Sequence, residues 1–194
     1  SISPEPNRML IKGCITKIDT ISDGSPCGAE GMQVVFTKKA AKDCYETFIG
    51  SPVNTQYGDW FSSEMFTEHT DKNVGFIRDA YIQGKDLMAE IVIWKDRDPS
   101  MANMIVQAMD SLGFSVEWYP TQTHEENGVM YMDAFEGCGC ALLFKQSAAF
   151  QSTYIESLAA SKENEENNRS DNMTVEEKQE FAKEIADIVM ASVE

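Results

Sequence analysis

Two side chains in this sequence have the types and the setting for nucleophilic catalysis. Ser115 stands one residue into a predicted strand that follows a predicted helix and Gly113. A serine hydroxyl is a poor nucleophile until a neighbouring base takes its proton. His69, at the entrance of another predicted strand, is a suitable base, and a third group would then orient its imidazole. The alternatives that the residues leave open are a structural histidine and a strand serine bonded to neighbouring backbone.

The remaining groups that could do chemistry give weaker patterns. His124 lies in a polar stretch, residues 121–127, and is interpreted as a solvated loop histidine. A metal site is the alternative to free thiols, with Cys138, Cys140 and the two histidines as its candidate ligands. The sequence has no second cysteine pair at the spacing typical of such sites. The odd count of five cysteines does not fit a secreted disulfide framework. We therefore expect free thiols in a reducing setting, with no metal and no cofactor.

Strands dominate the region that must position these residues. The pattern predicts strands at residues 9–18, 32–36, 73–82, 87–94, 114–119, 129–135 and 138–144, and helices at 38–48 and 100–111. Thr37 and the Asp98-Pro99 pair are typical of helix starts, and Gly84-Lys85-Asp86 is typical of a hairpin turn. Because many strands that are neighbours in sequence can pair antiparallel, the expected fold class is mainly β with flanking helices (α+β), as a β-barrel or strongly curved sheet.

The end of the chain has a different composition from this body. We expect residues 1–155 to form the main domain, and residues 156–173 to be an acidic flexible linker, because residues 161–172 contain no apolar side chain. The linker is followed by a predicted amphipathic helix within residues 174–194, which begins at a capping box formed by Thr174 and Glu177. This helix either packs on the body or binds another chain.

The charge balance excludes several classes of function. The 194 residues carry 16 basic and 32 acidic side chains, a net charge of −16, which argues against a nucleic-acid-binding protein. No apolar run approaches the roughly 18–20 residues of a membrane span, so we expect no membrane partner. Residues 1–7 lack the basic and apolar regions of a signal peptide, and the missing initiator Met indicates a processed or cropped product.

Several short segments, in their order along the chain, carry a resemblance to a known family. The segments are residues 50–53 (Gly-Ser-Pro-Val), His69, residues 73–82, residues 87–93 and residues 112–117 (Leu-Gly-Phe-Ser-Val-Glu). Together they resemble the prohead (capsid maturation) proteases of tailed phages, which are similar in fold to the herpesvirus assemblins. The resemblance covers roughly residues 8–155.

This resemblance implies a serine endopeptidase with an assemblin-like closed or strongly curved antiparallel barrel of seven strands. Ser115 takes the nucleophile position and His69 the general-base position. The substrates implied are the major capsid protein, the scaffolding protein and the protease itself, inside the assembling prohead in the host cytoplasm. Assemblin-like proteases often need a dimer, so a homo-oligomer is expected, and the acidic C-terminal region resembles the start of a scaffolding segment.

The sequence departs from the family at the third catalytic position, where Gly139 or Cys140 stands in place of an orienting acid or histidine. Glu136 would fill the role if a bulge near Gly137 or Gly139 shifts the side chains, and Asp133 is the next acid. The other possibilities are a bare Ser–His pair or an inactive domain. The paired arginines of assemblins are also absent near residues 144–147, so Lys145 or backbone amides would have to hold the oxyanion. A catalytically inactive scaffold or capsid-assembly protein with the protease fold, and an unrelated β-rich binding domain, remain alternatives.

Overall fold

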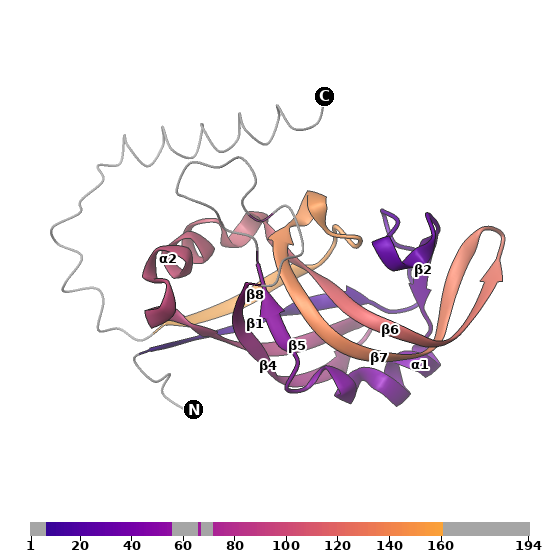
Figure 1. Ribbon diagram of the computed structural model, residues 1–194, viewed down its shortest axis with the longest axis horizontal. Coiled ribbons are helices and arrows are strands. Elements are labelled where there is room, and N and C mark those ends of the chain that lie inside the picture. Colours follow the sequence, from indigo (N-terminus) through magenta and orange to yellow (C-terminus); the bar gives the residue numbers. More distant parts are fainter. Residues whose placement is uncertain (1–6, 56–65, 67–71, 161–194) are drawn as a thin grey trace, which may run out of the picture. The chain divides into compact units, whose positions relative to one another are not determined.

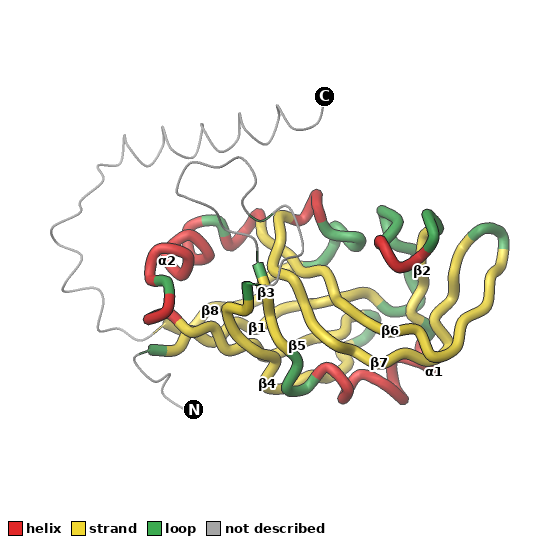
Figure 2. Tube along the Cα trace, viewed as in Figure 1, coloured by secondary structure: helices red, strands yellow, loops and turns green. Residues whose placement is uncertain are grey.

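The computed structural model describes residues 7–55, residue 66 and residues 72–160, which all fall within one compact unit. Its strands are β1 (Arg8–Lys17), β2 (Gln33–Phe36), β3 (Pro52–Asn54), β4 (Asn73–Gln83), β5 (Asp86–Trp94), β6 (Leu112–Glu126), β7 (Val129–Phe144) and β8 (Tyr154–Ala160). Its α-helices are α1 (Lys38–Cys44) and α2 (Pro99–Gln107). Strands make up the body of this unit and the helical segments lie at its margins (Figure 2).

All eight strands belong to one sheet, and β7 is its organising strand. The strand path runs β2-β7-β3-β4-β5-β1-β8, and β6 pairs with β7. One edge of β7 pairs with β6 to form a long antiparallel hairpin that extends past the other strands (Figure 1). Its other edge pairs in parallel with β2 and, further along, with β3.

The expectation of a closed or strongly curved antiparallel barrel is wrong. The sheet is mixed and open, because β2 and β3 both run parallel to β7 and the strand path ends at β2 and β8. One isolated bridge, between Ile18 and Phe36, joins the ends of β1 and β2, which is too little to close the sheet with a ladder. The expectation failed because it assumed that neighbours in sequence pair antiparallel, whereas β2 and β3 reach β7 through long connections.

The predicted helix starts are confirmed where a capping side chain marks them. Thr37 accepts a hydrogen bond from the Ala40 amide at the start of α1, and Asp98 does the same for the Met101 amide at the start of α2. Two predictions are wrong in extent. The stretch 121–127 is not a loop, since β6 continues to Glu126, and the two strands expected at 129–135 and 138–144 are one strand, β7.

The tail begins later than the composition suggests. β8 pairs with β1 as far as Ala160, so the first residues assigned to the linker belong to the sheet. Their backbone pairs with β1 along one edge, and Leu158 packs against the core. The rest of the predicted linker and the predicted helix at 174–194 lie outside the described residues. Among the described residues, no helix is both long and apolar enough to cross a membrane.

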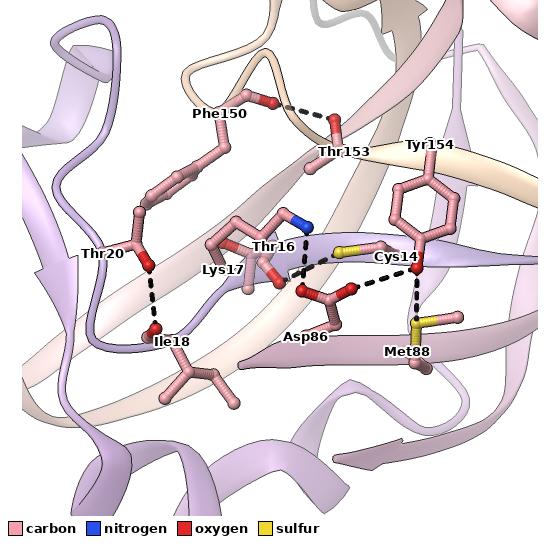
Figure 3. A network of polar contacts seen from close by, with 10 residues as sticks. All are labelled: Cys14, Thr16, Lys17, Ile18, Thr20, Asp86, Met88, Phe150, Thr153 and Tyr154. Carbon is pink, nitrogen blue, oxygen red and sulfur yellow. Dashed lines mark hydrogen bonds and ion pairs between the residues drawn. The ribbon is translucent and has the colours of Figure 1, made fainter. Parts of the chain in front are cut away.

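A polar network joins β1, β5 and β8 beside a bulge in β1 (Figure 3). The Lys17 ammonium donates to one oxygen of Asp86 at 2.8 Å, and the Tyr154 hydroxyl donates to the other at 3.0 Å. The buried Cys14 thiol donates to the Thr16 carbonyl oxygen at 3.4 Å. Burial raises the pKa of Cys14 from 9.0 to about 12, and burial together with the bond to Asp86 raises the pKa of Tyr154 to about 12.

These raised pKa values predict a loss of stability in alkali. Because the folded state holds the Cys14 proton more tightly than the unfolded chain, the contribution is fully present below pH 9.0 and is lost as the pH rises towards 12. At about pH 10.5 we expect the free energy of unfolding of the wild type to have fallen by about 2 kcal/mol more than that of Cys14→Ala, relative to neutral pH. Urea unfolding at the two pH values measures this difference.

The matched control is Cys27→Ala, because Cys27 is an exposed thiol. It should lose as much stability in alkali as the wild type does. An equal loss in Cys14→Ala and Cys27→Ala would contradict the prediction.

Candidate functional site

Ser115 lies in β6 with its side chain half-buried, directly opposite Ala141 of β7. Its neighbour Phe114 is fully buried in the core, and alternation along a strand therefore turns Ser115 to the opposite face of the sheet. Within the described part of the chain, the Ser115 hydroxyl forms no hydrogen bond. The hydroxyl is thus not used to hold the strand in place there, in contrast to the structural alternative that the sequence left open.

Three strands meet at the level of Ser115. Ala141 of β7 is the register partner of Ser115 on one side and of Asn54 of β3 on the other. Side chains of register partners point to the same face, so Ser115 and Asn54 flank the small Ala141 side chain at a backbone separation of about 10 Å. Asn54 is 6% exposed.

A carboxylate lies on the same face, two residues along β6 from Ser115. The Asn54 side-chain amide donates to Glu117 Oε1 at 2.8 Å. The other carboxylate oxygen lies over Gly139, since a Cβ built there would stand 2.2 Å from Glu117 Oε2. The carboxylate of Glu117 therefore occupies the space in which a side chain at position 139 would begin.

The Glu117 charge affects the two thiols next to Gly139. Burial, and then the nearby carboxylate, raise the pKa of Cys140 well above its ordinary value. The same two causes, in the same order, raise the pKa of Cys138. Both thiols are therefore protonated at neutral pH, which makes them poor nucleophiles and poor metal ligands. In the described ranges, His, Cys, Asp and Glu side chains nowhere gather in threes as a metal site would require.

The proposed general base cannot be placed in the same way. His69 lies outside the described residues, so its pairing with Ser115 stays a prediction. The other histidine, His124, lies near the exposed end of the β6–β7 hairpin, where its Nδ1 pairs with Asp133 and its ring stacks on Tyr131. The prediction that His124 is a solvated loop residue is therefore wrong, because it lies in β6 and pairs with Asp133.

The acids that the sequence offered as the third catalytic residue lie further along the hairpin. Glu136 is exposed and is the register partner of Tyr119, four positions from Ser115, which is about 13 Å of strand. Asp133 is engaged with His124. The structure thus does not bring either acid to Ser115. The expected bulge exists, between the pairs Glu117–Gly139 and Trp118–Gly137, but it lies between Ser115 and Glu136.

Lys145, the candidate for the oxyanion position, is also engaged. It follows β7 directly, and its ammonium donates to the Asp110 carbonyl oxygen at 2.7 Å. That carbonyl belongs to the short helical turn Met109–Ser111, which leads into β6. Lys145 therefore ties the end of β7 to the segment that delivers Ser115.

Comparisons with known proteins give one match. No protein-family model matches the sequence, and no curated protein matches it. Among solved structures, the chain is similar to the capsid assembly protease of bacteriophage T4, with 14% sequence identity and a TM-score of 0.39. The match covers 71% of this chain and 98% of that chain.

Nothing in the sequence indicated that Asn54 would contact the site. Glu117 and Gly139 were both noted in the sequence, but not that the Glu117 carboxylate would lie over Gly139. The position of Glu117 could have been predicted, because residues two apart in a strand point to the same face and Glu117 follows Ser115 by two residues. No local signal could reveal Asn54, which reaches Glu117 only because β3 pairs in parallel with β7.

Proposed function

We propose that this chain is a serine endopeptidase that processes scaffolding and capsid proteins, and itself, during phage prohead maturation. The observation that carries the proposal is the setting of Ser115. Its half-buried hydroxyl forms no hydrogen bond in the described part of the chain, and it shares a sheet face with a carboxylate and a buried amide. The sequence pattern around residues 112–117, which resembles that of prohead proteases, points to the same residue.

The mechanism in this proposal is acyl transfer. His69 takes the proton of the Ser115 hydroxyl as Ser115 Oγ attacks the scissile carbonyl carbon, and backbone amides stabilise the resulting oxyanion. The imidazolium then gives its proton to the leaving amine, and water releases the acyl-enzyme. The reaction would take place in the assembling prohead in the host cytoplasm, with the protease as a homo-oligomer.

A second candidate function is a catalytically inactive scaffold or capsid-assembly protein. The observation that favours it is the charge of residues 156–194, which hold 11 of the 32 acidic residues and 4 of the 16 basic ones. Such a segment would bind basic capsid surfaces by charge complementarity, and this binding would weaken with salt.

Co-expression with candidate capsid and scaffolding proteins separates the two functions. Intact masses of all partners are compared between the wild type and Ser115→Ala. The protease proposal expects shortened products with the wild type alone. Identical masses in both cultures would remove the protease and leave the assembly factor.

A further inference from the structure

The Thr153 hydroxyl binds the main chain of β6 directly beside Ser115. Thr153 is fully buried and immediately precedes β8. The Phe114 N–H donates to Thr153 Oγ1 at 3.0 Å. The hydroxyl shares its single proton between the Phe114 carbonyl oxygen at 3.0 Å and the Phe150 carbonyl oxygen at 2.9 Å, and Figure 3 shows the contact with Phe150. One side chain therefore holds both main-chain groups of the residue just before Ser115.

These contacts lie on the edge of β6 that faces away from β7. In an antiparallel pair, successive residues turn their N–H and C=O groups alternately towards the partner strand and away from it. Phe114 turns its groups to Thr153, so Ser115 turns its groups towards its register partner Ala141. Among the described residues, β6 pairs with no strand other than β7. Thr153 thus takes the place of a partner strand at this point and joins the start of β8 to β6.

Gly113 gives the Thr153 hydroxyl room to approach β6. A Cβ built at position 113 would stand 2.6 Å from Thr153 Oγ1 and 3.1 Å from the Thr153 carbonyl oxygen. A side chain at this position would therefore push the hydroxyl away from the strand. The glycine in the Leu-Gly-Phe-Ser segment, residues 112–115, is accounted for by this contact.

The position of Ser115 depends on its main chain, because its own hydroxyl forms no hydrogen bond in the described part of the chain. Without the Thr153 hydroxyl, the buried N–H and C=O of Phe114 would lose their bonds on this edge, which favours a shift of β6 that pairs them elsewhere. A displacement of about 1 Å at a reacting group can lower the rate about 10²-fold. A small shift of β6 would therefore reach the reaction through Ser115.

We propose that Thr153 is a positioning residue for Ser115. Its hydroxyl fixes the main chain of β6 at Phe114 and so sets the place from which Ser115 Oγ attacks the substrate carbonyl. This inference rests on the proposed function, in which Ser115 is the nucleophile. Thr153 acts on Ser115 only through the main chain of Phe114, so its removal should affect the chemical step more than substrate binding.

The first test does not depend on activity. Thr153→Val keeps the shape of the side chain and removes the hydroxyl, whereas Thr153→Ser keeps the hydroxyl. Amide hydrogen exchange is followed by NMR in the full-length protein, at Phe114 relative to Ile91 of β5, so that a general loss of stability cancels. Exchange at Phe114 should be about tenfold faster in Thr153→Val and close to the wild-type rate in Thr153→Ser.

The matched control for this test is Thr16→Val. The Thr16 hydroxyl is buried like that of Thr153, but it has no hydrogen-bond partner among the described residues. The same chemical change at this position should leave the relative exchange rate at Phe114 unchanged.

The second test uses the cleavage reaction, at a temperature at which thermal unfolding shows each variant to be folded. Thr153→Val should lower kcat about 10–10²-fold with little change in KM, and Thr153→Ser should restore kcat to within about threefold of the wild type. Ile91→Val removes one buried methyl group from β5 and should keep the wild-type kcat, which controls for a general loss of stability. If Thr153→Val does not fold, Thr153→Ser and Thr153→Ala give the same comparison.

The outcomes also distinguish the two proposals. If the wild type cleaves and Thr153→Val keeps its kcat, the inference is overturned and the protease stands. An unchanged relative exchange rate at Phe114 in Thr153→Val overturns the inference as well. If neither the wild type nor Ser115→Ala shortens a partner, the protease fails, whereas faster exchange at Phe114 in Thr153→Val would still support the placement of β6 by Thr153.

Discussion

Replacing Ser115 with alanine is expected to lower kcat for peptide cleavage by about four orders of magnitude or more. The hydroxyl is the attacking atom in the proposed mechanism, so its removal leaves no group to form the acyl-enzyme in that mechanism. The stability of the fold should change by less than about 0.5 kcal/mol, because Ser115 is half-buried and its hydroxyl forms no hydrogen bond in the described part of the chain. Cleavage of a peptide that spans a junction found by intact mass measures the rate.

Two further variants make this prediction specific. Ser111→Ala removes an exposed serine four residues away and should cleave at the rate of the wild type. The double variant with His69→Ala should be within about tenfold of Ser115→Ala, because residues that act as one unit are not additive. Cleavage by Ser115→Ala at a rate near that of the wild type would show that another group attacks the peptide.

Replacing Gly75 with alanine is expected to have the largest effect on stability. Gly75 lies in β4, between Val53 of β3 and Ile93 of β5. A Cβ at this position would stand 2.0 Å from the Val92 carbonyl oxygen and 2.9 Å from its carbon. These atoms are backbone, so the clash can be relieved only by separating the strands. We expect a loss of about 3 kcal/mol or more in the free energy of unfolding, or failure to fold.

Thermal unfolding measures this effect, with an expected fall in Tm of about 6–12 °C for a folded variant. Gly24→Ala is the matched control, since the nearest atom to a Cβ there is the Ala149 Cα at 4.0 Å. Similar Tm values for the two variants would contradict the prediction. In a folded Gly75→Ala protein, the strain would fall on the pairing of β4 with β3, which carries Asn54.

The site shows how far residue types alone can lead. Ser115 is predicted as a nucleophile from its hydroxyl chemistry and from its place after a predicted helix and a glycine. The resemblance to prohead proteases marks Gly139 as a position where an orienting acid or histidine is expected. In the structure this glycine leaves room for the Glu117 carboxylate of the neighbouring strand. A sequence shows which side chain is absent from a position but not which neighbour fills the space.

The local elements can be predicted from the amino-acid sequence alone. The strands joined at Gly84 and Lys85, and the helices that begin after Thr37 and Asp98, follow from turn chemistry, capping and alternation, which act within a few residues. The parallel pairing of β2 and β3 with β7, and the open sheet that results, become visible only in the folded chain. Parallel pairing needs strands that are distant in sequence, and no local preference specifies which distant strand will be the partner. The contact of Asn54 with Glu117 depends on that pairing, which is why it appears in the fold and not in the sequence.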